Sequence, residues 1–154
     1  MRYSGIIFND MAAAPGLCVT LFVQGCPHRC PGCHNPETWD FEGGKEFTQE
    51  TLDMILNGLT AQGIQRNLCI MGGEPLCEEN YLLTYLVVST IKRKLPHTKI
   101  YIWTGYLFEQ LTDPIVKDIL ELTDCVIDGP YVEAERDITL LMRGSRNQRI
   151  IDLS

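Results

Sequence analysis

The 154-residue sequence has no long apolar run. No stretch approaches the roughly 20 consecutive apolar residues that a membrane-spanning helix needs. The first residues also lack the charged start, apolar middle and small-residue cleavage site of a secretory signal. With 45% hydrophobic and 21% charged residues, the composition is typical of globular proteins. We therefore expect a cytoplasmic protein without a membrane partner.

Basic residues are scarce beside acidic ones. The 13 Lys and Arg against 20 Asp and Glu give a formal net charge of −7. Binding to a nucleic-acid backbone depends on clustered Lys and Arg that release counterions from the phosphates. We therefore expect no nucleic-acid partner. The one basic segment, residues 143–149, has two interpretations: a solvated charged face, or a loop that docks a partner or contacts a ligand.

Strand-like and helix-like segments alternate along a chain that is too short for two domains of ordinary size, so residues 1–154 are expected to form a single domain. Short β-branched or aromatic runs predict buried strands. These runs are residues 5–8, 18–23, 67–71, 99–103, 125–127 and 149–151.

Three helices are predicted between these strands. The clearest begins after Thr48, a common N-cap residue, and repeats apolar side chains at the i, i+3, i+4, i+7 spacing of one buried face. The apolar positions are Leu52, Ile55, Leu56 and Leu59. The second covers residues 78–95 before Pro96, and the third follows Asp113-Pro114, which suits an N-cap with proline at the first helical position.

This alternation of strands and helices predicts an α/β fold with parallel strands. The sheet is either open and doubly wound or part of a (β/α) barrel. The chain is well short of the roughly 250 residues of a complete eight-unit barrel. In both arrangements ligands bind at the C-terminal ends of the strands, where the candidate site residues follow.

Three of the seven cysteines crowd into one short segment with the spacing Cys-x3-Cys-x2-Cys. An odd number of cysteines clustered in this way is a poor disulfide framework and indicates a metal. We call Cys26, Cys30 and Cys33 the cysteine triplet, and residues 26–33 the cysteine loop. One interpretation is a structural zinc site or an electron-transfer module. The fourth zinc ligand would then be His28, His34, Cys69 or Cys77.

The alternative is a [4Fe–4S] cluster. Zinc ligands usually come as two separated pairs, and no second pair follows the cysteine triplet. A cubane cluster ordinarily takes four thiolates. With only three, the fourth iron is left free to bind a substrate.

Glycines follow the predicted strand that ends at Met71. Taken alone, the sequence Gly72-Gly73-Glu74-Pro75 is explained better by a tight turn than by a loop whose backbone approaches a ligand closely, and only its combination with the cysteine loop favours the ligand. Thr104 follows the next strand and lies at the same expected edge of the sheet.

The cysteine loop after a strand resembles the hallmark of the radical S-adenosylmethionine superfamily. The resemblance implies a partial (β/α) barrel, incomplete and TIM-like, that holds a [4Fe–4S] cluster on Cys26, Cys30 and Cys33. It implies S-adenosylmethionine as the second cofactor, cleaved reductively to a 5′-deoxyadenosyl radical by a radical oxidoreductase. The family often has an aromatic residue where this chain has Gly32.

The same resemblance assigns the ligand contacts. Gly72, Gly73 and Glu74 would hold the methionyl ammonium through a charge-assisted hydrogen bond. The adenine would contact the backbone of the cysteine loop, and a strand-end residue would line the pocket. These further cofactor-binding residues are Gly32, Cys33, His34 and Thr104.

Two further segments resemble activases of glycyl radical enzymes. Residues 34–40, which run on from Cys33, resemble their Cys-His-Asn…Thr-Trp-Asp segment. Residues 142–151 are similar to the Arg-Gly-Ser-x-Asn-Gln-Arg stretch of the activases of anaerobic ribonucleoside-triphosphate reductase. This implies that the radical abstracts a hydrogen atom from a glycine of that reductase, with reduced flavodoxin or a similar protein as the electron donor. Two enzymatic alternatives stay open: an activase of another glycyl radical enzyme, and a small-molecule enzyme resembling 7-carboxy-7-deazaguanine synthase.

Overall fold

Seven strands form one mixed sheet in the order β3-β1-β2-β4-β5-β6-β7, which is not closed into a barrel. The computed structural model describes residues 1–154. The strands are β1 (Arg2–Asp10), β2 (Cys18–Val23), β3 (Lys45–Glu46), β4 (Asn67–Gly72), β5 (Ile100–Trp103), β6 (Cys125–Asp128) and β7 (Arg149–Asp152). The α-helices are α1 (Gln49–Leu59), α2 (Tyr81–Lys94) and α3 (Pro114–Glu121). No helix is both long and apolar enough to span a membrane.

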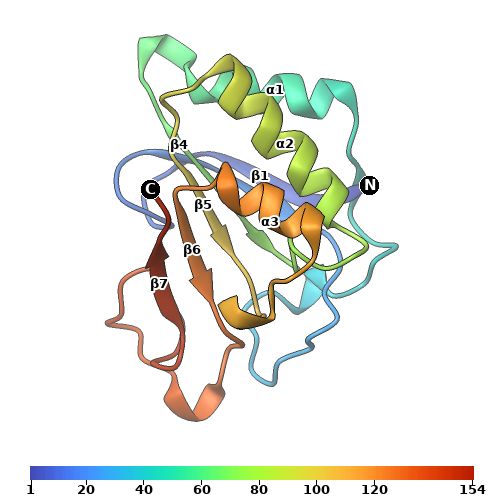
Figure 1. Cartoon of the computed structure of the whole chain (residues 1–154), viewed down its shortest axis with the longest axis vertical. Helices are drawn as coiled ribbons and strands as arrows, with labels where there is room; N and C mark the ends of the chain where they lie inside the picture. The colour runs from blue at the N-terminus through green and yellow to red at the C-terminus, as the bar shows by residue number, and fades with distance from the viewer.

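The four central strands β2, β4, β5 and β6 are parallel, and one helix connects each to the next. All three helices lie on the same face of the sheet (Figure 1). When each right-handed crossover leads to the neighbouring strand on the same side of the previous one, all the connecting helices lie on one face of the sheet. The doubly wound alternative, with helices on both faces, is therefore wrong, and the predicted mixture of helices with parallel strands is confirmed.

The outer strands differ from the prediction, because β1 pairs antiparallel with β2, and β7 pairs antiparallel with β6. The link at residues 11–17 is shorter than the dozen or so residues of a parallel crossover, which forces the antiparallel pairing of β1. The prediction that these strands are buried is wrong for Ile7, Phe8 and Ile150, which are exposed. The short edge strand β3 was not predicted.

The helices begin as their caps predict. Thr48 Oγ1 accepts a hydrogen bond from the amide of Thr51 at 3.4 Å, and the carboxylate of Asp113 accepts one from the amide of Ile115 at 2.9 Å. On α1 the predicted apolar face is buried, with Leu56 only partly so. Helix α2 begins three residues later than predicted, because the turn after β4 extends to Asn80.

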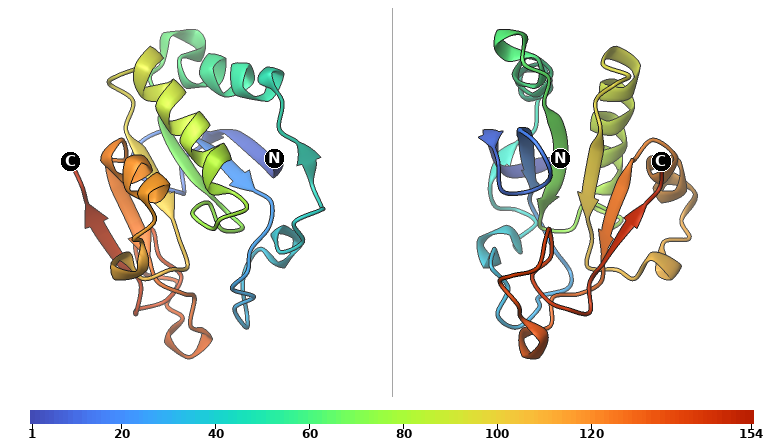
Figure 2. Two further views of the ribbon diagram at one scale, coloured as in Figure 1. Left: turned by 45° about the vertical axis from the view of Figure 1, so that its right-hand side comes forward. Right: turned by 90° about the vertical axis from the view of Figure 1, so that its left-hand side faces the viewer.

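The main core lies between the sheet and the helices, where alternate residues of the parallel strands pack against α1, α2 and α3. The opposite face carries a smaller cluster around Ala14, Cys18 and Cys69. Cys18, Cys69 and Cys125 are buried in strands, as predicted for small apolar side chains. The loops that follow β2, β4, β5 and β6 gather below the sheet in both views of Figure 2.

Candidate functional site

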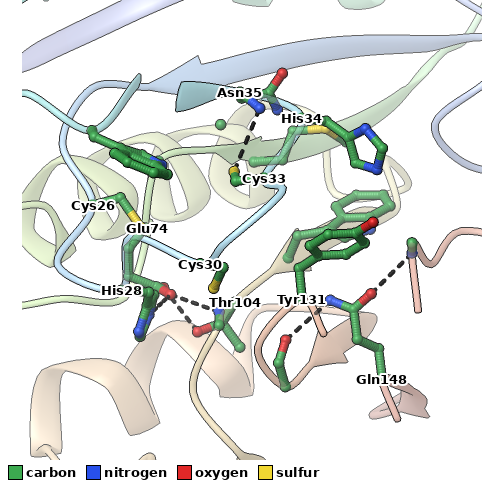
Figure 3. Close-up of a pocket in the computed structure, with 18 residues that line it drawn as sticks. Cys26, His28, Cys30, Cys33, His34, Asn35, Glu74, Thr104, Tyr131 and Gln148 are labelled. Atoms are coloured by element: carbon green, nitrogen blue, oxygen red, sulfur yellow. Dashed lines mark hydrogen bonds and ion pairs between the residues drawn. The ribbon is translucent and has the colours of Figure 1, made fainter. Parts of the chain in front are cut away.

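A pocket of about 190 Å³ opens where the parallel strands end (Figure 3). The loops after four different strands supply its walls, because the carboxyl ends of parallel strands meet at one edge. The lining residues are Cys26, His28, Cys30, Cys33, His34, Asn35, Trp39, Met71, Gly72, Gly73, Glu74, Trp103, Thr104, Gly105, Gly129, Tyr131, Gly144 and Gln148.

The cysteine triplet lines this pocket as a whole. All three side chains are partly buried, and burial raises the pKa of the Cys26 thiol to about 11. A metal that binds this thiol must therefore displace its proton. No three His, Cys, Asp or Glu side chains are close enough together to hold a metal ion. The structure thus brings the triplet into one pocket without gathering its sulfurs into a ligand set.

Neither additional cysteine is placed to complete a zinc site with the triplet. Cys69 lies inside the sheet beside Cys18, and Cys77 is buried with its thiol donating to the carbonyl oxygen of Glu74 at 3.2 Å. Neither lines the pocket. Of the two histidines, His28 is bound to Glu74, and His34 packs edge-on against Tyr131.

Glu74 lies at the base of the pocket with 1% of its surface exposed. One carboxylate oxygen, Oε1, accepts from His28 Nε2 at 2.6 Å and from the amide of Gly105 at 2.7 Å. The other, Oε2, accepts from the amide of Leu76 at 2.9 Å and the hydroxyl of Thr104 at 2.8 Å. A carboxylate offers about four acceptor positions. The chain's own donors therefore occupy all of them.

The glycine turn after β4 packs directly against the start of the cysteine loop. A Cβ on Gly73 would collide with the carbonyl oxygen of Gly25 and lie 3.0 Å from that of Thr38. Gly72 has a positive φ of 111°. Side chains are therefore excluded at both positions, as a close approach of two backbones requires.

The basic segment 143–149 folds back to form one wall of the pocket. The side chain of Gln148 accepts from the amides of Gly144 and Ser145 at 2.9 and 3.1 Å and donates to the carbonyl oxygen of Gly129 at 3.0 Å. The guanidinium of Arg149 pairs with the fully buried Asp128 and with Glu109. Only part of this run is therefore a free basic surface.

Two features of the pocket fit a bound cofactor: the three thiols of the cysteine triplet and a buried polar atom without a hydrogen-bond partner. Trp39 lines the pocket, and its buried Nε1 has no hydrogen-bond partner. Buried unpaired donors are rare, so a bound group is expected to meet this one. Three thiols on one loop that lines the pocket fit a metal cluster.

The structure brings most of the predicted site residues together. The cysteine triplet, His34, Gly72, Gly73, Glu74 and Thr104 all line the pocket. Gly32 does not, because it faces the side chain of Glu133. Tyr131 and Gln148 were not predicted, although Gln148 belongs to the C-terminal segment that carries a family resemblance. For Tyr131 the sequence offers no signal.

The fold and the pocket define an α/β protein with a cysteine-lined cofactor site at its strand ends. A family model described as "4Fe-4S single cluster domain" matches residues 12–151, which favours iron–sulfur over zinc.

Relatives of the chain match it over nearly its whole length. It is 36% identical over 149 residues to the anaerobic ribonucleoside-triphosphate reductase-activating protein of Escherichia coli K12, covering 96% of each chain. It is 37% identical over 151 residues to the protein of that name from Vibrio cholerae, covering 97% of each. It is 38% identical over 150 residues to the one from phage T4, covering 97% of this chain and 93% of the relative. The chain belongs to the family of anaerobic ribonucleoside-triphosphate reductase-activating proteins.

Proposed function

We propose that the chain is a radical S-adenosylmethionine enzyme that installs a glycyl radical on an anaerobic ribonucleoside-triphosphate reductase. The observation that carries the proposal is the meeting of the cysteine triplet, the glycine turn 72–74 and Thr104 in one pocket. Family membership supports the reductase as the protein substrate.

The fold supports the proposal as an incomplete, TIM-like (β/α) barrel. Successive parallel strands with all helices on one face are the unit from which such barrels are built. The sheet stops before closure. The site lies at the C-terminal ends of the strands, as in complete barrels.

In the proposal Cys26, Cys30 and Cys33 bind a [4Fe–4S] cluster as thiolates. When bound, the cluster supplies one electron that breaks the sulfur–C5′ bond of S-adenosylmethionine, giving methionine and the 5′-deoxyadenosyl radical, which takes a hydrogen atom from a glycine of the reductase. A very low cluster potential demands a strong reductant. Reduced flavodoxin or a similar cytoplasmic protein is the proposed donor.

The glycine turn and Glu74 are the proposed site for the methionyl ammonium. Because the four acceptor positions of Glu74 are filled, the ammonium must replace one donor or bind the backbone carbonyls of Gly72 and Gly73. The backbone of His34 is the proposed adenine contact, and Thr104 lines the pocket. The predicted adenine contact of Gly32 is not part of this proposal, because Gly32 faces Glu133 and lies outside the pocket lining. The unpaired Nε1 of Trp39 is a further donor available to the ligand.

A protein substrate suits the surroundings of the pocket. A second hollow adjoins it and shares His34, Met71 and Trp103 with its wall. This hollow is partly apolar and includes Ile138, which is 83% exposed. An extended segment of a partner can reach the pocket through such an opening, whereas a small-molecule enzyme must itself exclude water from its radical.

Anaerobic reconstitution tests the proposal. The protein with iron and sulfide is expected to form a cluster, and with dithionite and S-adenosylmethionine it should yield 5′-deoxyadenosine, quantified by liquid chromatography. Substitution of any triplet cysteine by alanine should abolish both. A wild-type protein that binds zinc in place of a cluster, or that forms a cluster and yields no 5′-deoxyadenosine, would show the proposal to be wrong.

A further inference from the structure

The middle of the cysteine loop is held to the rest of the protein by a single hydrogen bond. Before it, Gly25 and Cys26 donate their amides to the carbonyl oxygens of Thr38 and Trp39. Residues 27–32 make no backbone hydrogen bond to any residue outside the loop. Within the loop there is one, from the amide of Cys33 to the carbonyl oxygen of Cys30. The exception is the side chain of His28, which reaches Glu74.

The His28 ring occupies a fitted site. Its Nε2 lies 2.6 Å from Glu74 Oε1, and the ring packs edge-on against Tyr106 with the centroids 4.5 Å apart. On another side it lies over Gly105, where a Cβ would come within 2.5 Å of His28 Cδ2 and 2.7 Å of Nε2. The absence of a side chain at Gly105 is what admits the ring.

The anchor of this contact is rigid. Glu74 is almost completely buried, and the amides of Leu76 and Gly105 fix its two oxygens from two different strand ends. Since a carboxylate oxygen only accepts, the proton of this hydrogen bond lies on His28 Nε2. The Arg29 guanidinium also lies 5.8 Å from the centroid of the Trp39 ring, but residues 27–32 form no second hydrogen bond to the rest of the protein. A hydrogen bond to a charged acceptor is stronger than a neutral one, so the bond from His28 can restrain the loop.

We propose that His28 is a positioning residue that fastens the cysteine loop to Glu74 and so presents Cys26, Cys30 and Cys33 to one pocket before any cofactor binds. The bond confines the three cysteines to one pocket, and this confinement lowers the entropy lost when their sulfurs gather around one cluster. The restraint of the loop follows from the geometry alone, whereas its benefit for a cluster rests on the proposed function.

The first test measures loop order in the cofactor-free protein by ¹⁵N relaxation of residues 28–33. The wild type should have order parameters near those of rigid backbone, about 0.85, and His28→Ala should fall below about 0.6. His97→Ala, at an exposed histidine far along the chain, is the matched control and should leave the loop unchanged. A loop that is equally ordered in the wild type and in His28→Ala overturns the proposal.

Steric coupling between His28 and Gly105 gives a second test. Gly105→Ala should displace the ring and disorder the loop, as His28→Ala does. The double variant should be no more disordered than either single variant, because the displaced ring is already gone. His28→Gln retains an N–H donor and should restore part of the order. Additive effects of the two substitutions would contradict the proposed contact.

Cluster assembly gives a readout separate from activity. In anaerobic reconstitution His28→Ala should incorporate iron and sulfide about ten- to a hundredfold more slowly than His97→Ala, the range expected from losing one hydrogen bond to a charged group. Equal rates would refute the link between loop order and assembly. A wild-type protein that yields no 5′-deoxyadenosine would contradict the proposed function. The order of the loop in the cofactor-free protein tests the role of His28 independently of that result.

Discussion

Replacing Glu74 with Gln tests whether the buried carboxylate organises the strand ends. Each carboxylate oxygen accepts from one backbone amide and one side chain: Oε1 from Gly105 and His28, Oε2 from Leu76 and Thr104. An amide has one oxygen, so its NH₂ group must face one of these pairs. The side chains can adapt, since a hydroxyl rotates and a histidine changes tautomer. The backbone amide of that pair cannot.

The expected loss is therefore one buried backbone donor left without an acceptor. Such a group costs about 1–3 kcal/mol. The less costly orientation turns the Gln oxygen toward Leu76, whose amide is buried, and leaves the partly buried amide of Gly105 unpaired. For a chain of this size the loss corresponds to a fall of roughly 2–12 °C in the melting temperature.

Thermal and urea unfolding of the cofactor-free protein, followed by circular dichroism, measure this loss. Glu78→Gln is the matched control, because Glu78 is exposed and its side chain forms no hydrogen bond in the structure, so its melting temperature should equal that of the wild type. If Glu74→Gln has the same melting temperature as the wild type and Glu78→Gln, the four hydrogen bonds to Glu74 do not stabilise the fold, and the predicted loss is refuted.

Three further predictions concern the walls of the pocket. Alanine at any triplet cysteine should abolish cluster absorbance after reconstitution, whereas Cys125→Ala should leave it intact, since that thiol is buried within a strand far from the pocket lining; the reverse ranking would contradict the ligand assignment. Gly73→Ala should lower the melting temperature and weaken S-adenosylmethionine binding measured by calorimetry, because the added Cβ collides with backbone atoms. Gly5→Ala is the control, since its Cβ meets nothing within 4 Å, and it should change neither the melting temperature nor the binding. Equal melting temperatures of the two variants would contradict the close packing of the glycine turn. Arg149→Met should lower the urea midpoint at neutral pH, because it leaves the buried carboxylate of Asp128 in β6 without its cation. Arg149 also holds the pKa of Glu109 below its usual value, so part of the difference in midpoint from the wild type should disappear as the pH falls through that lowered pKa. A difference in midpoint that does not change with pH would contradict the role of the Arg149–Glu109 pair.

Local signals in the sequence predict most of the fold. Thr48 and Asp113 cap their helices in the structure because a capping hydrogen bond depends only on neighbouring residues. The apolar spacing on α1 likewise identifies its buried face. The direction of β1 was mispredicted, although the short link at residues 11–17 carries the information in its length. The exposure of β7 depends on its place at the edge of the sheet, which no local pattern encodes.

The site is predicted less completely, because its contacts join residues far apart in sequence. The cysteine spacing and the glycine turn identify two walls of the pocket. The bond from His28 to Glu74 spans 46 positions, and no spacing rule relates them. Tyr131 enters the pocket because the loop after β6 folds toward the cysteine loop, and that arrangement exists only once the sheet has formed.

Electron paramagnetic resonance on the reconstituted protein mixed with its family's reductase tests the central claim most directly. With S-adenosylmethionine and a strong reductant under anaerobic conditions, the account predicts a glycine-centred doublet on the reductase. The doublet should collapse to a singlet when the reductase carries α-deuterated glycine, and it should be absent with any triplet cysteine replaced by alanine. A wild-type sample that consumes S-adenosylmethionine and gives no glycine-centred signal would contradict the account.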